Sequence, residues 1–456
     1  MFQNITEFVN YATSLRGRNP SVGTVKADTA IAKCVAFQDS IGNPQNNLNI
    51  VHIAGTSGKG STAQLIARGL LSQGFSVGVG VSPHLVSITE RFLINNKPIS
   101  DLKLLHYANT LYPKFESFGA TSLYGPLSFF EMMTAMQFYI FDKENLAYCV
   151  METGVGGRLD ATNIPLESKI CVLNSIGLDH THWLGETVEL IAVEKAEIMQ
   201  PNSLTIALSQ TQSINKIFQQ IADKNSSELD FVIPNFDFNS VVLSRKENTL
   251  RTCFNYVDQD LREHQLQLQL CGEYQAVNCA LALRAIETIA DKDDWTIDWA
   301  ILIGAINKLQ IEGRFEQIDY NDKPLILDGA HNPQKMYAFL GSLFKVYTDD
   351  KFNLILAFKD KKDVDAMLAE VIKYRDNWNC VIITSFEVNQ DMPIKSVEVD
   401  ILESKVIELG ITNYRIEPNI ATALELISTL EPEVITVITG SLYLVGGIKK
   451  IINDIT

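Results

Sequence analysis

Short apolar runs alternate with stretches of helical length over the first 210 residues of the chain. Runs of strand length occur at 48–55, 75–82, 146–154, 168–177 and 203–209. Segment 61–74, which follows the first run, has the pattern of a helix that Gly74 ends. Strands separated by helices in this way are typical of a parallel sheet with crossover helices.

The pattern changes between about 230 and 271, where consecutive strand-like segments follow one another without helices, so a small antiparallel subsheet is expected. A helix is predicted over 274–290. From residue 324 the alternation resumes, with strands predicted in "PLILDGAH", "FNLILAFK", "NCVIITSF" and "EVITVITGS". We place a domain boundary near "IEGRFEQ" (311–317), because a Gly-Arg step there precedes a fresh α/β unit.

Composition and net charge limit the classes of binding partner that are expected. The chain carries 38 Lys and Arg against 54 Asp and Glu, a net charge of −16. This argues against a nucleic-acid or anionic-membrane partner, because no overall positive field draws in phosphates. Seven scattered cysteines without a CxxC pair suit a reducing compartment. The start lacks a secretion signal and no apolar stretch reaches the roughly 18–20 residues of a membrane span, so we expect a cytoplasmic protein.

The stretch "VHIAGTSGKGST" (51–62) places three glycines and a lysine between a predicted strand and a predicted helix. Such a turn directs backbone N–H groups and a helix N-terminus to one point, which suits phosphate. The loop is shorter than the usual phosphate loop, and its first hydroxyl comes one position late. The residues predicted to bind nucleotide are Gly55, Thr56, Ser57, Gly58, Lys59, Gly60, Ser61 and Thr62. The alternative is a glycine-rich turn with an incidental lysine.

Two further predicted strands end in residues that bind metals. "VMETGVGGRLDATN" (150–163) leads from an apolar strand directly into Glu152, and "NSIGLDHTHWLGET" (174–187) places Asp179, His180 and His182 after its strand. Open α/β sheets bind ligands at the carboxyl ends of their strands, and carboxylates bind Mg²⁺ directly or through water. Singly, each signal is as well explained by a solvated acid or a turn histidine. Together with Ser61 they favour a shared metal site.

Other segments offer substrate contacts. In "SPHLVSITERF" (82–92), expected as a loop over the sheet edge, Ser82 is either a metal ligand or a helix cap. "GPLSFFEMMTAMQFYIF" (125–141) is mostly a core helix, although its start could present a flat surface to an aromatic ligand. Lys195 in "AVEKAEIM" lies in a helical stretch, where a surface ion pair is the simpler explanation.

The second half repeats the strand-end signals more weakly. "ILDGAHNP" (326–333) and "TGSLYLVGG" (439–447) end predicted strands, but such turn compositions are common. Arg314 in "EGRF" lies at the predicted hinge, where an arginine can cover a triphosphate when domains close.

The order of these motifs resembles one known family. The motifs are "GTSGKGST", "SPHLVSITERF", "LSFFEMMT", "METGVGGRLDATN", "GLDHTHWLGET", "EKAEIM", "EGRFE", "DGAHNP" and "TGSLYLVG". They resemble those of the folylpolyglutamate synthase/dihydrofolate synthase family, a branch of the Mur-ligase superfamily, over nearly the whole chain. "LDHTHWLG" and "LSFFE" are more similar to the bacterial bifunctional enzymes than to the polyglutamylating ones.

With this resemblance, we expect an α/β fold of two domains. Residues 1–311 would form an N-terminal P-loop ATPase domain, with a mostly parallel sheet plus a small antiparallel subsheet. Residues 312–315 would form the hinge, and 316–456 a C-terminal Rossmann-like α/β domain that acts as the glutamate ligase. The resemblance further implies ATP and Mg²⁺ as cofactors, dihydropteroate or a reduced folate and L-glutamate as substrates, and a monomer.

The resemblance also implies the reaction and the residue roles. A pteroate or folate carboxylate attacks the γ-phosphate to give an acyl phosphate and ADP, and the amine of glutamate then displaces phosphate. The implied catalytic residues are Lys59, His180 and Lys195, the last at the position of the family's carbamylated lysine. The implied metal ligands are Ser61, Ser82, Glu152 and His180. The implied nucleotide contacts beyond the loop are Asn278, Arg314 and Asp328. The implied substrate contacts are Ser82, Pro83, His84, Ser128, Phe130, Asp179, His331 and Ser441.

The chain departs from the family pattern at four positions: Ser57 replaces Asn, Tyr274 replaces His, Glu197 replaces Gly, and Glu312 replaces Pro. Glu197 would add negative charge beside a carbamylated lysine. Three alternatives stay open: a monofunctional folylpolyglutamate synthase, a P-loop small-molecule kinase, and a non-enzymatic nucleotide switch. A kinase would leave His180, Lys195 and the C-terminal domain without a role.

Overall fold

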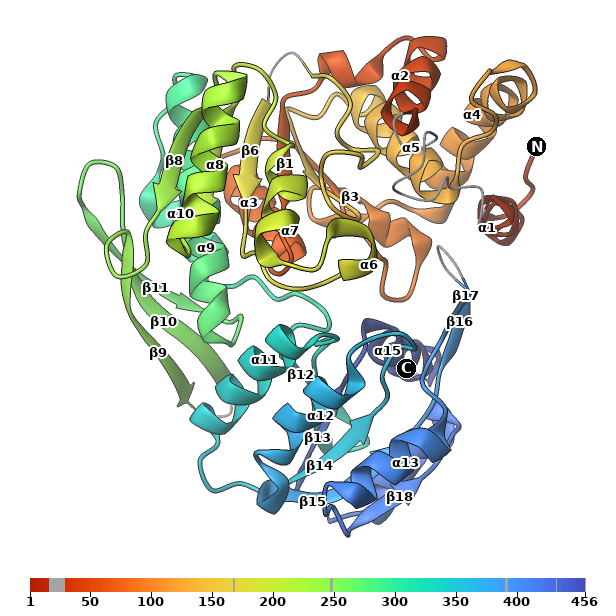
Figure 1. The fold of residues 1–456 in the computed structure, drawn as a ribbon, viewed down its shortest axis with the longest axis vertical. Coiled ribbons are helices and arrows are strands. Elements are labelled where there is room, and N and C mark those ends of the chain that lie inside the picture. Colours follow the sequence, from red (N-terminus) through yellow and green to blue (C-terminus); the bar gives the residue numbers. More distant parts are fainter. Residues whose placement is uncertain (16–28, 167–168, 247–248, 390–392, 432, 456) are drawn as a thin grey trace. The chain divides into compact units, whose positions relative to one another are not determined.

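A computed structural model describes residues 1–15, 29–166, 169–246, 249–389, 393–431 and 433–455 of the chain (Figure 1). The chain is divided into two compact units. Unit 1 comprises Met1–Ser240, Phe254–Leu266 and Gln275–Leu309, and unit 2 comprises Val241–Cys253, Gln267–Tyr274 and Gln310–Thr456. Among the described residues, no helix is both long and apolar enough to cross a membrane.

Unit 1 is built on an eight-stranded sheet of order β4-β3-β2-β5-β1-β6-β7-β8. The strands are β1 Ile50–Ala54, β2 Val77–Gly80, β3 Phe92–Ile94, β4 Lys97–Pro98, β5 Tyr148–Glu152, β6 Lys169–Leu173, β7 Leu204–Leu208 and β8 Glu228–Val232. All neighbours from β2 to β8 pair in parallel, and β3 and β4 add an antiparallel edge. The mostly parallel sheet is confirmed. Strands β1 and β6 are buried throughout, which explains their unbroken apolar sequences.

Helices lie against this sheet and form the core of unit 1 with it (Figure 1). They are α1 Ile5–Ser14, α2 Ala30–Ser40, α3 Lys59–Ser72, α4 Asp101–Thr121, α5 Phe129–Lys143, α6 Thr181–Leu184, α7 Val188–Ala196, α8 Gln212–Asn225, α9 Glu273–Lys292 and α10 Trp299–Ile306, with short 3₁₀ turns at Pro44–Asn47 and Ile88–Arg91. Gly69 lets α3 approach α9 and α10, because a Cβ there would lie 2.3 Å from Ile286 Cδ1 and 2.9 Å from Leu302 Cδ1.

The region predicted as an antiparallel subsheet differs in part from the prediction. Strands β9 Phe238–Lys246, β10 Thr249–Val257 and β11 Glu263–Leu268 form a three-stranded sheet of order β11-β10-β9. The first segment expected there, residues 230–244, is divided: its beginning belongs to β8, which pairs in parallel with β7 at the edge of the large sheet, and its end belongs to β9. The chain turns between β8 and β9 at Pro234 and at Asn235, which has a left-handed φ of 67°. This turn separates two strands that the sequence presents as one.

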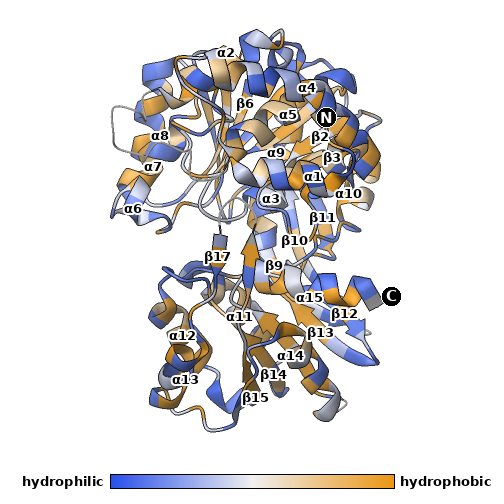
Figure 2. Cartoon of the chain, turned by 90° about the vertical axis from the view of Figure 1, so that its right-hand side faces the viewer, coloured by the Kyte–Doolittle hydropathy of each residue, from blue (hydrophilic) through white to orange (hydrophobic). Residues whose placement is uncertain are grey.

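Unit 2 contains a six-stranded sheet of order β12-β13-β19-β14-β15-β18. The strands are β12 Glu316–Tyr320, β13 Lys323–Leu327, β14 Phe352–Leu356, β15 Trp378–Ile383, β18 Tyr414–Ile416 and β19 Ile435–Thr439, with a separate hairpin of β16 Glu387–Asn389 and β17 Pro393–Lys395. Only β12 runs antiparallel. The helices are α11 Pro333–Val346, α12 Val364–Ile372, α13 Val399–Glu408, α14 Ile420–Leu426 and α15 Leu442–Ile455. The central strands are strongly hydrophobic (Figure 2), as the predicted Rossmann-like fold requires.

We expect Gly69→Val to lower the melting temperature, because its methyl groups have to enter the tightly packed contact of α3 with α9 and α10. Overpacking of this kind costs about 1–3 kcal/mol. Gly304→Val is the matched control, since a Cβ on this glycine of α10 meets nothing within 4 Å. Thermal unfolding followed by circular dichroism checks the pair. Equal melting temperatures for the two variants would contradict the packing described here.

Candidate active site

The glycine-rich loop connects the end of β1 to α3, which begins at Lys59. Gly58 has a left-handed φ of 88°, and a Cβ there would lie 2.2 Å from Asn278 Oδ1, so this position requires glycine. The backbone amides of Thr56 and Ser57 donate to the carbonyl of Ser175, at 2.7 and 3.3 Å. These two predicted nucleotide contacts therefore use their N–H groups within the protein.

Lys59 and Glu152 form an ion pair beside the glycine-rich loop. Lys59 Nζ lies 3.8 Å from Glu152 Oε1 and donates to the carbonyl of Gly55 at 3.1 Å. The other carboxylate oxygen, Glu152 Oε2, accepts from the backbone N–H of Ser82 at 3.3 Å, and a Cβ on Gly60 would lie 3.4 Å from it. The parallel register of Ile53 with Glu152 brings the ends of β1 and β5 to one level. The structure thus brings together three segments that the sequence predicted separately: the glycine-rich loop, the segment of Glu152 and the segment of Ser82.

These residues fit a magnesium ion. Mg²⁺ prefers one or two carboxylates together with phosphate oxygens and water, rather than a cage of protein ligands. Glu152 supplies the carboxylate, and Ser61 is buried in the first turn of α3 on the same loop. In the described parts of the chain, no group of three or more His, Cys, Asp or Glu residues could hold a metal. The protein thus offers few ligands, as expected for an ion whose coordination would be completed by the phosphate oxygens of a nucleotide.

Asn174, which is not among the predicted site residues, forms hydrogen bonds to residues on both sides of the glycine-rich loop. Its amide Nδ2 donates to Thr62 Oγ1 at 2.7 Å and to Asn278 Oδ1 at 3.2 Å, and its Oδ1 accepts from the N–H of Ser175. The side chain is fully buried. Asn174 therefore ties the loop helix α3 to α9, where Asn278 was predicted to contact nucleotide. The sequence signal that could have identified Asn174 is its position as a polar residue directly after a buried strand.

His180 follows β6, the strand next to β1 in the sheet, and Lys195 lies in α7. His180 has a left-handed φ of 51° and stacks its ring on Trp183, with centroids 5.6 Å apart. Its Nε2 lies 4.0 Å from Asp179 Oδ1. Lys195 is buried near the end of α7, so it does not lie on the solvated helix surface that the simpler explanation assumed. Its carbonyl lies 2.9 Å from the position of a Cβ on Gly157, which joins α7 to the glycine turn after Glu152.

The predicted substrate contacts of unit 1 lie in two connected segments. His84 Nδ1 accepts from Arg91 Nε at 2.9 Å, and burial, with the charge of Arg91, lowers the pKa of His84 to about 3. Arg91 is itself buried, 5.1 Å from the centre of the Phe129 ring. Ser128 caps α5, and its hydroxyl accepts from the N–H of Glu131. Phe130 packs on the glycine turn, since a Cβ on Gly154 would lie 2.5 Å from its ring. Ser82 and Pro83 precede His84 in a loop, so Ser82 is not a helix cap.

In unit 2, Arg314 and Asp328 lie together at the ends of two turns. Asp328 accepts from the backbone N–H groups of Phe315 and Ala330, at 2.9 and 2.8 Å. Burial raises the pKa of this carboxyl to about 6, against the opposing charge of Arg314. A Cβ on Gly329 would lie 3.0 Å from Arg314 Nη1. The "EGRF" and "DGAH" turns therefore form one packed cluster.

His331 and Ser441 follow the neighbouring parallel strands β13 and β19. His331 Nδ1 donates to the carbonyl of Gly329 at 2.8 Å, and its Nε2 lies 3.0 Å from Lys335 Nζ. Ser441 is buried, and its hydroxyl accepts from the N–H of Tyr443. Lys335 was not predicted, because nothing in "DGAHNPQK" marks the lysine as part of the turn.

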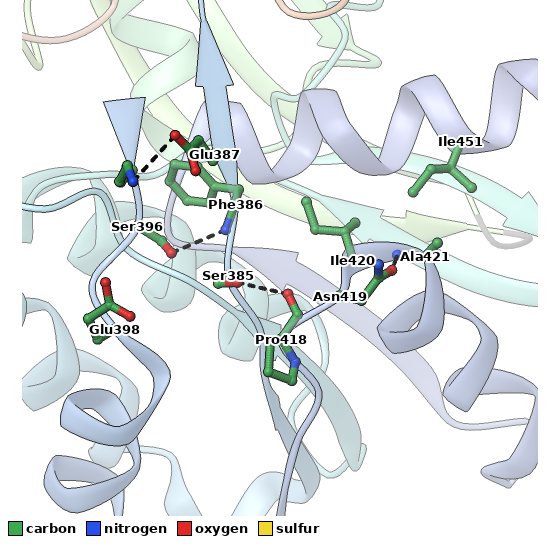
Figure 3. A pocket seen from close by; sticks show the side chains of 11 residues that line it. Ser385, Phe386, Glu387, Ser396, Glu398, Pro418, Asn419, Ile420, Ala421 and Ile451 are labelled. Atoms are coloured by element: carbon green, nitrogen blue, oxygen red, sulfur yellow. Dashed lines mark hydrogen bonds and ion pairs between the residues drawn. The ribbon is translucent and has the colours of Figure 1, made fainter. Parts of the chain in front are cut away.

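Unit 2 also contains a pocket of about 530 Å³ beside the β16–β17 hairpin (Figure 3). Glu387 and Lys395 form an ion pair of 3.4 Å on its wall, and Ser385 donates to the carbonyl of Pro418. Its lining includes none of the predicted site residues.

Known proteins match this chain over most of its length. Residues 124–286 match the family model described as Mur ligase middle domain, and residues 309–451 match dihydrofolate synthetase, C-terminal domain. Dihydrofolate synthetase of Saccharomyces cerevisiae is 28% identical over 448 residues, covering 94% of this chain and 98% of the relative. Dihydrofolate synthase/folylpolyglutamate synthase of Bacillus subtilis is 27% identical, covering 90% and 92%. The crystal structure of folylpolyglutamate synthase from Thermotoga maritima superposes with a TM-score of 0.81 at 26% identity, covering 99% and 97%.

We expect Asn174→Leu to weaken ATP binding about tenfold, because Thr62 and Asn278 lose a shared buried partner, a loss worth roughly 1–3 kcal/mol. Asn46→Leu is the control, since Asn46 is exposed. Isothermal titration calorimetry with a nonhydrolysable ATP analogue measures both. An unchanged affinity for Asn174→Leu would show that the loop does not depend on this residue.

Proposed function

Since the chain belongs to the folylpolyglutamate synthase/dihydrofolate synthase family of the Mur-ligase superfamily, we propose that it is an ATP-dependent ligase that joins L-glutamate to dihydropteroate and to reduced folates. The products are an amide, ADP and phosphate. The Glu152 carboxylate carries this proposal, because Lys59, Ser82 and the turn at Gly60 all converge on it.

The reaction requires two anions to meet. The acceptor carboxylate attacks the γ-phosphorus, the bond to the β,γ-bridging oxygen breaks, and ADP leaves with that electron pair. The amine of glutamate then attacks the acyl phosphate, loses a proton, and expels phosphate. Lys59 neutralises the outer phosphates, while Glu152, Ser61, Ser82 and His180 would hold Mg²⁺, which supplies further charge neutralisation when bound.

Two observations bear on the substrates. The match of residues 309–451 to a dihydrofolate synthetase C-terminal domain supports activity on dihydropteroate. The similarity to a B. subtilis protein named for both activities supports folylpolyglutamate synthesis by the same chain. We therefore propose the bifunctional activity. All seven cysteines are free thiols, six of them buried, which supports a reducing, cytoplasmic location.

Lys195 acts in this scheme as a carbamate. Reaction of its amine with CO₂ converts a buried cation into an anion that can assist metal binding beside Glu152. Glu197, the departure that argued against this, has a partly exposed carboxylate that lies 3.1 Å from Lys224 Nζ. Its charge is compensated there, which removes the electrostatic objection.

The test of the function is phosphate release by the purified protein with MgATP. We expect release to require both L-glutamate and an acceptor, with dihydropteroate and tetrahydrofolate offered separately and the products weighed by mass spectrometry. Turnover with only one acceptor would reduce the proposal to a single activity. Release that needs neither substrate would refute the ligase, and a phosphorylated alcohol would favour a kinase.

We expect Lys195→Ala to lose at least 100-fold in turnover, because the variant lacks the carbamate. Acetate or formate at millimolar concentration should restore part of the activity by placing a carboxylate in the vacated space. Lys216→Ala, which removes an exposed lysine of α8, serves as the control for the loss of a positive charge and should retain most activity. Full activity in Lys195→Ala, without added acid, would assign the lysine a purely structural role.

A further inference from the structure

We infer that Lys33 is a positioning residue for the acceptor substrate: by neutralising Glu131 in the first turn of α5, it fixes the place of the Phe130 ring. This inference rests on the proposed ligase function, in which the acceptor carries a pteridine ring. Lys33 lies in α2, outside the motifs that contain the predicted site residues.

Lys33 and Glu131 form a buried ion pair in unit 1. Lys33 Nζ lies 2.6 Å from Glu131 Oε2, and the two side chains are only 6% and 7% exposed. Burial of two charges is tolerated when they are paired and hydrogen-bonded. Loss of one partner leaves the other as an uncompensated buried charge, which is more destabilising than the replacement of both by neutral side chains. The position of Glu131 therefore depends on Lys33.

Glu131 also closes the N-terminal end of α5. Its Oε2 accepts from the backbone N–H of Ser128 at 2.7 Å, and the Ser128 hydroxyl accepts from the backbone N–H of Glu131 at 3.4 Å. This reciprocal pair is a capping box, which satisfies two backbone donors at the start of the helix. The carboxylate oxygen that pairs with Lys33 is thus the same atom that holds the backbone of the helix cap. A change at Lys33 is transmitted to the first turn of α5.

Phe130 belongs to that first turn. It is the second residue of α5, and a Cβ on Gly154 would lie 2.5 Å from Cζ of its ring, so the ring packs on the glycine turn that follows Glu152. Phe130 is partly buried, and it therefore retains surface that a ligand can contact. Aromatic rings stack on flat ligands in specific orientations. The orientation of this ring is set by the helix turn that carries it.

The buried side of α2 faces a second carboxylate that supports the glycine turn. Asp160 accepts from the backbone N–H of Val155 at 2.9 Å. Burial raises the pKa of the Cys34 thiol well above its ordinary value, and the charges of Glu131 and Asp160 act in the same direction. Lys33, the residue before Cys34, opposes them. Its positive charge therefore offsets negative charge at both supports of the Phe130 ring, the helix start and the glycine turn.

The test is a double-mutant cycle on steady-state kinetics with Lys33→Met, Glu131→Gln and Lys33→Met/Glu131→Gln. Glutamine also serves in a capping box, so the double variant keeps the box and removes both charges. We expect each single variant to raise the KM for the acceptor at least tenfold, because each leaves one buried charge unpaired. In the double variant this KM should return to within threefold of the parent. The acceptor is dihydropteroate or tetrahydrofolate, whichever the parent turns over.

Two comparisons separate positioning of the acceptor from a general structural role. The KM for ATP and kcat should stay within threefold of the parent in all three variants, because Lys33 acts on the start of α5 and not on the glycine-rich loop. Lys103→Met is the control, since the Lys103 ammonium also pairs with a carboxylate, that of Glu144 at 2.5 Å, but its side chain is 44% exposed. This control should stay within twofold of the parent in every constant.

An unchanged acceptor KM in Lys33→Met would overturn the inference. So would an equal rise of the KM values for acceptor and ATP, which marks a structural role, or a double variant as impaired as the single ones. If Lys33→Met does not yield folded protein, Glu131→Gln and the double variant decide by the same criteria. A parent protein without acceptor-dependent phosphate release would instead refute the proposed function, so the two failures are distinguishable.

Discussion

The alignment of β1 with its two parallel neighbours determines where the chemistry of unit 1 can lie. Ile53 is level with Glu152 on one side, and Ala54 is level with Leu173 on the other. This register brings Glu152 to the lysine of the glycine loop and places Asn174 beneath the same loop. A slip of one residue would turn both side chains to the opposite face of the sheet. Because all three strands are buried, their apolar contacts hold the polar residues that follow them in place.

The parts of the site that were predictable are those encoded locally. A strand, a glycine turn and a helix are contiguous in sequence, so the loop around Lys59 could be recognised, and Glu152 ends a run whose burial is evident. Asn174 was missed because its partners Thr62 and Asn278 lie more than 100 residues away along the chain. The assignment of β8 was wrong in part for a related reason: the turn at Pro234 and Asn235 redirects the chain, and strand propensity does not specify the partner strand.

Lys195 shows a second reason why the sequence pattern did not predict the structure correctly. Its sequence neighbours are acidic, which predicts a solvated helix surface, yet the close approach of Gly157 to the carbonyls of Glu194 and Lys195 buries the end of α7. Burial of an ammonium is unfavourable unless it is paired or chemically changed. The carboxylate of Glu197, only two positions away, is partly exposed and lies 3.1 Å from Lys224 Nζ. Two residues with similar sequence neighbours therefore have different environments in the fold, since Lys195 is buried and Glu197 is partly exposed.

A chain with a net charge of −16 can bind anionic substrates only where cations are held in specific positions. Lys59 is held by the carbonyl of Gly55 and stands 3.8 Å from Glu152, beyond hydrogen-bond length. Arg314 donates to the carbonyl of Gly313, and burial raises the pKa of its neighbour Asp328 to about 6. Lys335 Nζ lies 3.0 Å from His331 Nε2. Lys59 and Arg314 are each oriented by a hydrogen bond to a backbone carbonyl, so their positions do not depend on the phosphate or carboxylate of the substrate. Charged groups that are oriented before the substrate binds are what electrostatic preorganisation requires.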